Sequence, residues 1–101
     1  NGVWSLAGGT SASAPLWAAL IAIANQMAGH SLGFINPALY QLAISSHYTQ
    51  DFHDITVGNN NVDYKGVTVP GYAAVQGWDP VTGWGTPNAE KLLPDLIAAM
   101  K

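Results

Sequence analysis

The chain has 101 residues, of which 49% are hydrophobic and only 9% are charged. It contains three lysines, no arginine and six acidic residues, so its formal net charge is -3. Nucleic-acid-binding proteins need a basic stripe to neutralise phosphates, and this composition excludes that class. An average domain has about 25% charged residues. The shortage here predicts that the protein works at acidic pH, that more polypeptide covers its surface, or both.

The remaining totals predict one soluble unit without covalent cross-links. A length near 100 residues is that of a single small domain with one core. The absence of cysteine excludes disulfides and thiolate metal sites. The longest apolar run ends at Asn25 and is shorter than the roughly 20 residues that cross a membrane. Because the chain starts at Asn1 without a methionine or a signal segment, we expect a piece of a longer precursor.

The first third of the chain predicts a turn, a strand and a helix. The Asn-Gly pair at residues 1–2 is a favoured hairpin turn, and residues 3–7 are expected to form a short strand. Residues 12–28 predict a helix with Pro15 in its first turn and Gly29 after its end. This helix is hydrophobic on every face, so we expect it to be buried on every side.

The middle of the chain predicts one short helix between irregular segments. Residues 36–43 are expected to be helical, because an Asn-Pro pair supplies an N-cap and a proline at the first helical position. Residues 51–61 pair a brief strand-like run with a turn-forming cluster. Residues 62–76 predict an irregular loop with an extended piece at 67–69.

The C-terminal part predicts a loop followed by a helix. Residues 77–87 place tryptophans between flexible glycines and are expected to form loops. A final helix is predicted from Pro87 to Met100, with Thr86 as its N-cap. Pro94 either kinks this helix or starts a second helical piece.

The first candidate for chemistry is Ser11, in the small-residue stretch that precedes the first helix. At a strand-to-helix junction its Oγ would be exposed, and the N–H groups of the first helical turn can stabilise an anion beside it. A nucleophile next to part of an oxyanion hole suits acyl transfer. The alternative is that Thr10 or Ser11 only caps the helix, which is the usual role of serine before a helix.

A nucleophilic serine also needs a base, and no histidine or acid stands at a recognisable spacing from Ser11. His30 is expected in a loop and His47 on the surface. His53 next to Asp54 is a better candidate, although a structural hydrogen bond is the simpler interpretation. The base therefore stays unassigned by spacing.

Two aspartates in predicted loops form a second constellation. Asp54 precedes Ile55, and Asp79 ends the run Gly77-Trp78-Asp79. Carboxylates next to glycine- and asparagine-rich chain that can turn carbonyls inward suit Ca²⁺, and two aspartates balance its charge. The alternative is that both aspartates cap turns, as aspartates in loops commonly do.

Five motif blocks occur along the chain in a fixed order: Gly9–Leu16, Asn36–Tyr40, Phe52–Asn60, Gly77–Gly83 and Gly85–Pro87. Together they resemble the C-terminal part of the sedolisin family of serine-carboxyl peptidases, and most of all its kumamolisin-like members. The resemblance covers essentially the whole chain. Residues 1–101 would then be the C-terminal segment of a single peptidase catalytic domain whose remainder lies upstream.

The resemblance implies a fold and a reaction. The family has a subtilisin-like, three-layer α/β fold with a mostly parallel sheet and a buried helix after the nucleophile. It hydrolyses peptide bonds at acidic pH, which implies a secreted protein or another acidic compartment. By this resemblance Ser11 is the nucleophile. The family's glutamate base, its assisting aspartate and its oxyanion aspartate lie upstream and outside this chain. A carboxylate with a pKa of about 4.3 suits this pH, whereas histidine would be protonated.

The resemblance also implies one bound Ca²⁺. The carboxylates of Asp54 and Asp79 and the carbonyls of Ile55, Val75 and Gly77 would be its ligands. Val75 departs from the family pattern, in which glycine is common, and a positive φ would suit valine poorly. Gly8, where many relatives have serine, is a second departure and lies outside the catalytic step.

The implied partners are the upstream part of the same peptidase and a protein or peptide substrate, with no nucleic acid and no membrane. Without its base, the chain alone is expected to be inactive. Two alternatives stay open. One is a subtilisin-type protease with a histidine base, against which the Asp-Ile and Gly-Trp-Asp-Pro blocks argue. The other is a catalytically inactive homologue or a structural fragment.

Overall fold

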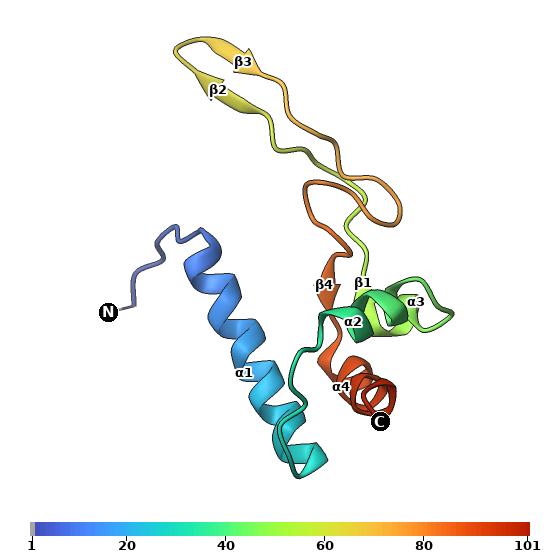
Figure 1. The fold of residues 1–101 in the computed structure, drawn as a ribbon. Helices are drawn as coiled ribbons and strands as arrows, with labels where there is room; N and C mark the ends of the chain where they lie inside the picture. Colours follow the sequence, from blue (N-terminus) through green and yellow to red (C-terminus); the bar gives the residue numbers. More distant parts are fainter. Residues whose placement is uncertain (1) are drawn as a thin grey trace.

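The computed structural model describes residues 2–101, which form helices and two small antiparallel sheets (Figure 1). The elements are α1 Thr10–Ala28, α2 Asn36–Ala43, α3 Tyr48–Asp51, β1 Phe52–His53, β2 Val62–Tyr64, β3 Val67–Val69, β4 Thr86–Pro87 and α4 Ala89–Ala99. Each sheet has two strands, β1 with β4 and β2 with β3. The described residues by themselves form no parallel sheet.

The core is built around α4, which packs against α1, α2 and α3. Leu92 and Leu96 have no exposed surface, and Leu93 is 4% exposed. Their spacing places them on one face of the helix, as expected for an amphipathic element. The other buried apolar residues of this core are Ala24, Leu32, Ala38, Leu42, Ala43 and Phe52.

The predicted C-terminal helix is confirmed, but it starts later than expected. Its N-cap is Asn88 rather than Thr86, because Thr86–Pro87 forms β4 and pairs with β1. The backbone N–H of Asn88 donates to the carbonyl of Asp51 at 2.8 Å, which joins the start of α4 to the end of α3. Pro94 lies inside a helix that continues to Ala99.

Helix α1 is also confirmed, and it begins two residues earlier than predicted. Gly9, with φ of 93°, is its N-cap, and Gly29 ends it in the left-handed conformation. Pro15 is consequently in the second turn and not in the first. Since proline has no N–H, the carbonyl of Ser11 has no i+4 helical partner.

The expectation that α1 is buried on every side is wrong for this structure. One stripe packs on the core, with Ala24 fully buried and Trp17, Leu20, Ile21 and Ala28 partly so. The opposite faces are exposed: Leu16 is 66% and Met27 is 55% exposed. Among residues 2–101, α4 is the main helix against which α1 packs, so a helix that is apolar all round keeps its other faces in solvent.

One prediction for an extended segment fails. Residues 3–7 form no strand, because no described segment pairs with them. The turn predicted at residues 1–2 includes Asn1, which lies outside the described residues. The extended piece predicted at residues 67–69 is confirmed as β3, but it pairs with β2 in a regular hairpin that the predicted irregular loop did not include. Its two turn residues, Lys65 and Gly66, both have positive φ, as a tight type I′ turn requires.

The hairpin of β2 and β3 extends away from the helices (Figure 1), and all of its residues are exposed. The radius of gyration is 16.4 Å, against about 13 Å for a compact domain of 100 residues. The chain is therefore an open arrangement with its packed part around α4. None of the described helices has the length and apolarity that a membrane crossing requires.

Candidate functional site

Ser11 is exposed and is the second residue of α1. The cap position belongs to Gly9, whose carbonyl accepts the N–H of Ala12 at 3.1 Å. No side chain makes a capping hydrogen bond at this end, so neither Thr10 nor Ser11 has the cap role that was the alternative. The Ser11 hydroxyl stands free beside the positive end of a helix dipole, where the first N–H groups have no helical acceptor.

No base accompanies Ser11 within the described part of the chain. Among residues 2–101, no hydrogen bond joins it to a histidine or a carboxylate. His30 lies in an exposed loop as predicted, where its Nδ1 is 2.9 Å from the carbonyl of Ser31. His47 is exposed as predicted but pairs with Asp95 at 2.8 Å.

A groove of about 600 Å³ lies along α1 directly after Ser11. Its walls are the first half of α1 and the segment that leads into α4. They include Ser13, Leu16, Trp17, Leu20, Thr86 and Pro87. The groove that follows Ser11 along α1 is thus mainly apolar.

Four of the residues predicted as calcium ligands are joined in two pairs by hydrogen bonds. The N–H of Gly77 donates to Oδ2 of Asp54 at 2.7 Å, and the N–H of Val75 donates to Oδ2 of Asp79 at 3.2 Å. Both carboxylates are therefore held by one short segment, residues 75–79. Ile55, the fifth residue, directly follows Asp54 and is half-buried.

Asp79 is almost completely buried, with 1% of its surface exposed. Its Oδ1 accepts the N–H groups of Val81 at 3.0 Å and Thr82 at 2.8 Å, and the Thr82 hydroxyl lies 3.0 Å from both carboxylate oxygens. Burial by itself raises the pKa of Asp79, but hydrogen bonds from Thr82, Val75 and Val81 outweigh it and lower that pKa. The charged form is therefore favoured, as a metal ligand and a turn cap both require.

Asp54 differs from Asp79 because one of its carboxylate oxygens has no hydrogen-bond partner within the described chain. Its Oδ2 accepts the Gly77 N–H, whereas its Oδ1 is buried and has no hydrogen-bond partner within the described chain. A buried carboxylate oxygen without a donor costs free energy unless a cation or another donor reaches it. The donor set thus fits a hard cation at Asp54.

Val75 does not have the positive φ that would suit valine poorly. Within the described residues, the one non-glycine residue with positive φ is Lys65, so Val75 has an ordinary backbone conformation. Gly77 has φ of 81° and does use the freedom of glycine. The departure from glycine at residue 75 therefore adds no backbone strain.

Comparisons with known proteins are consistent with the motif blocks. No protein-family model matches the chain. Kumamolisin of a Bacillus species is 45% identical over 97 residues, which are 96% of this chain and 16% of that protein. Tripeptidyl-peptidase sed1 of Aspergillus fumigatus is 42% identical, over 99% of this chain and 14% of its own length. Tripeptidyl-peptidase 1 of Mus musculus is 42% identical, over 88% of this chain and 16% of its own length.

The chain belongs to the sedolisin family. It corresponds to a C-terminal part of these relatives and spans 14 to 16% of their length. The resemblance predicted from the five motif blocks is thereby confirmed. Two of these three relatives are tripeptidyl-peptidases by name.

Sequence reasoning missed the aromatic wall beside the sedolisin-type aspartates. The Tyr48 hydroxyl donates to the carbonyl of Trp84 at 2.9 Å, and their rings meet edge to face with centroids 5.3 Å apart. Burial raises the pKa of Tyr48 to about 12, with further contributions from Asp54 and Asp79. Since the charges of both aspartates act on this hydroxyl, Tyr48 marks the place where the two loops meet.

His53 and Asp54 line one hollow together with Tyr48, Gly77 and Trp84. The structural hydrogen bond expected between His53 and Asp54 is not formed within residues 2–101, because Asp54 accepts from Gly77 instead. The backbone at Gly85 lies so close to His53 that a Cβ at residue 85 would collide with the carbonyl of His53. No local signal pointed to Tyr48, which lies 36 residues from its acceptor in the sequence.

Proposed function

We propose that this chain is the C-terminal segment of a single, acid-acting serine-carboxyl peptidase domain that hydrolyses peptide bonds in proteins or peptides. One observation carries the proposal. An exposed Ser11 begins a helix in a chain whose sequence is 42 to 45% identical to kumamolisin and tripeptidyl-peptidases over most of its length. The upstream part of the same domain would supply the glutamate, the aspartate and the oxyanion aspartate.

Ser11 is the proposed nucleophile. Its hydroxyl is exposed, and the dipole of α1 together with the free N–H groups of its first turn favours negative charge at this point. During peptide hydrolysis, a carboxylate base from the upstream part takes the hydroxyl proton as Oγ attacks the peptide carbonyl. Because a glutamate has a pKa of about 4.3, this base works in acid. The chain alone lacks the base and is expected to be inactive.

The exposed apolar residues near Ser11 support the idea of a larger domain. Trp4 and Leu6 are fully exposed, and Leu16 is 66% exposed. Apolar patches of this kind are rarely left in water. In the proposed domain, residues 3–7 join a mostly parallel sheet in a subtilisin-like, three-layer fold, and upstream chain buries α1.

Calcium is the proposed cofactor. Asp54 and Asp79 would supply carboxylate oxygens, and Ile55, Val75 and Gly77 would supply carbonyls. Support comes from the buried, unpartnered Oδ1 of Asp54 and from the two hydrogen bonds that tie residues 75–79 to both carboxylates. When bound, the ion would supply positive charge that holds these two loops together, and it takes no part in proton transfer.

The proposed setting is an acidic compartment or the outside of the cell. The low content of charged residues and the preference of a carboxylate base for acid support it. The subtilisin-type alternative would need a histidine near Ser11. The described residues offer none bonded to it.

The decisive experiment measures peptidase activity of the intact protein on a fluorogenic peptide between pH 3 and 7. We expect activity that is highest near pH 4 and that falls by about a thousandfold or more in Ser11→Ala. Ser13→Ala, a neighbouring helix serine, is the matched control and should retain activity. Full activity in Ser11→Ala would exclude this nucleophile. Activity that rises toward neutral pH would favour a histidine base, and an intact protein without activity would favour the inactive homologue.

A further inference from the structure

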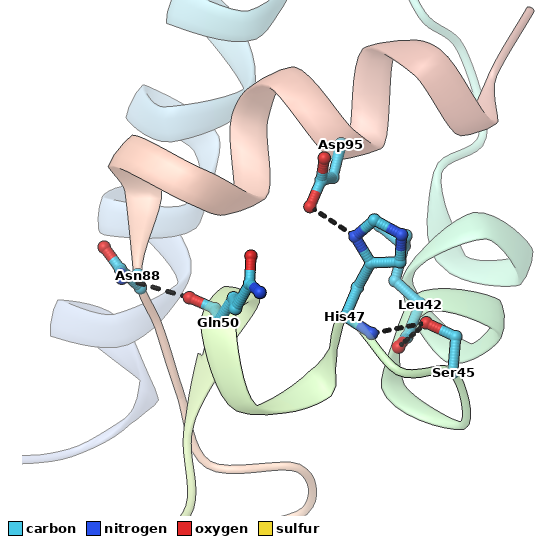
Figure 2. A network of polar contacts seen from close by, with 6 residues as sticks. All are labelled: Leu42, Ser45, His47, Gln50, Asn88 and Asp95. Atoms are coloured by element: carbon cyan, nitrogen blue, oxygen red, sulfur yellow. Dashed lines mark hydrogen bonds and ion pairs between the residues drawn. The ribbon is translucent and has the colours of Figure 1, made fainter.

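Three titratable side chains converge at the end of the core opposite the hairpin, and none of them belongs to the predicted catalytic or calcium set. His47 precedes α3, Asp51 ends α3, and Asp95 lies on α4. One potential ligand atom from each lies within 4.8 Å of the others. Figure 2 shows the His47 ring facing Asp95, with Nδ1 2.8 Å from the nearer carboxylate oxygen.

The least ordinary member of this cluster is Asp51. It has no exposed surface, and neither of its carboxylate oxygens has a hydrogen-bond donor among the described residues. A buried carboxylate normally accepts hydrogen bonds. When it has no partner, the folded state bears the full free-energy cost of removing the carboxylate from water. Either a proton shared with Asp95 or a bound cation has to neutralise these oxygens.

The backbone holds Asp51 in this position. Its N–H donates to the carbonyl of His47 at 2.9 Å, and its carbonyl accepts the N–H of Asn88 at 2.8 Å. The Asn88 side chain also donates to the carbonyl of Gln50 at 3.0 Å (Figure 2). These hydrogen bonds fix the backbone of Asp51 at the junction between α3 and α4.

The preceding turn orients His47 in the same way. Its N–H donates to Oγ of Ser45 at 3.1 Å, and that hydroxyl donates to the carbonyl of Leu42 at 2.7 Å (Figure 2). The His47 and Asp95 side chains are 49% and 28% exposed. The cluster is thus open to solvent on one side and closed by Asp51 on the other.

We propose that His47, Asp51 and Asp95 bind a first-row divalent transition-metal cation, with Zn²⁺ as the best match. One imidazole nitrogen with two carboxylate oxygens is a mixed N/O donor set that suits zinc, whereas calcium and magnesium prefer oxygen alone. Donor atoms around tetrahedral zinc lie about 3.4 Å apart. His47 Nδ1 and the nearer Asp95 oxygen, now 2.8 Å apart, would therefore separate slightly, and more distant donors, all within 4.8 Å, would move closer. The exposed side leaves room for a water as fourth ligand.

The charges around the cluster agree with this assignment. Burial and the neighbouring Asp95 together raise the pKa of Asp51 to about 6, against the opposing effect of His47. Contacts with Asp51 and His47 lower the pKa of Asp95, and Lys91 on the same helix adds to that effect. The competing occupant of the cluster is one shared proton, which a metal ion would displace as pH rises.

The proposal is independent of the peptidase function, and its test does not use activity. The intact protein is freed of metal with a chelator, supplied with excess Ca²⁺, and titrated with Zn²⁺ at pH 7 by calorimetry. One equivalent should bind, and His47→Gln and Asp95→Asn should each weaken binding by about tenfold or more. Glu90→Gln, an exposed acid on the same helix, is the matched control and should bind as the unchanged protein does.

A second measurement guards against misfolded variants. In the unchanged protein, Co²⁺ should give the intense visible absorption of four-coordinate cobalt, and Zn²⁺ should remove it. Absence of zinc binding, or equal binding in all variants, would overturn the proposal. A protein that ignores zinc but loses stability as pH rises through about 6 would also overturn it and would assign the cluster to a shared proton.

Discussion

The region around α4 and the region around Ser11 contain equally apolar residues in opposite surroundings. Leu92 and Leu96 have no exposed surface, whereas Trp4 and Leu6 are fully exposed and Leu16 is 66% exposed. The first region finds its partners in α1, α2 and α3, and the second finds none among the described residues. An apolar side chain is therefore more stable when it is buried, but it is buried only where other elements of the chain pack against it.

This difference has a functional side. The region around α4, here called the self-supporting region, holds the His47 cluster, while the uncovered region holds Ser11. Ser11 has no base among the described residues, and α1 has exposed apolar faces. The proposed upstream part of the domain would supply both the base and the cover. The following predictions test whether the two regions differ in this way.

The largest expected effect is on the core. In the intact protein, Leu96→Ala should lower the free energy of unfolding by about 2 to 5 kcal/mol because it leaves a cavity. If upstream chain covers α1 as proposed, Leu16→Ala should cost about 2 kcal/mol or more as well. Urea unfolding measures both. A cost within about 0.5 kcal/mol for Leu16→Ala would contradict the proposed cover.

Calcium should tie the loops of residues 54–55 and 75–79 to the self-supporting region. At a free concentration one hundred times the dissociation constant, it should stabilise the intact protein by about 2.7 kcal/mol. Asp79→Asn should abolish this gain, while Asp63→Asn on the exposed hairpin should retain it. Thermal unfolding with and without a chelator measures the gain, and an unchanged gain in Asp79→Asn would refute the ligand assignment.

Gly85 tests the contact between β1 and the segment before α4. Gly85→Ala should destabilise the protein by about 2 kcal/mol or more, because φ is 95° and the new Cβ would meet the His53 carbonyl. Gly83→Ala also has positive φ but faces open space, so it should cost about 1 kcal/mol. Equal midpoints of urea unfolding for the two variants would show that the close approach is absent.

The smallest expected effect is the pH dependence that Asp51 causes in metal-free protein. Its pKa is raised from 3.8 to about 6 in the folded state, so the folded protein binds the extra proton. The stability from this proton is fully present below pH 3.8 and is lost as pH rises through about 6. The loss should be on the order of 1 to 2 kcal/mol. Asp51→Asn should remove it, and an unchanged pH profile would contradict the shift.

Local sequence signals predicted three of the helices with small errors at their ends. Asn36-Pro37 marked the start of α2 to within one residue, and Gly29 marked the end of α1. The start of α4 was misplaced because Thr86 and Pro87 pair with β1, and that partner lies more than 30 residues away in the sequence. The second strand of the hairpin was predicted, but its pairing with β2 was missed because Lys65-Gly66 is a weak signal for its tight turn.

The candidate sites divide in the same manner. The motif blocks predicted Ser11, Asp54 and Asp79, and the structure adds that one segment, residues 75–79, holds both aspartates. Tyr48, whose hydroxyl bonds to Trp84, carried no local signal. The ion pair of His47 with Asp95 spans 48 residues. The spacing of residues along the chain does not predict contacts between residues so far apart in the sequence, because these contacts form only when the chain folds.

By itself, the sequence determined where three of the four described helices lie, which serine stands at a helix start and which family the chain belongs to. These properties depend on neighbours within a few residues or on motif order. Only the tertiary structure decided that one stripe of α1 is covered, that Asp54 keeps a buried oxygen free, and that Asp51 faces Asp95 and His47. Each of these depends on elements far apart in the chain meeting in space, where burial and charge act over a few ångströms.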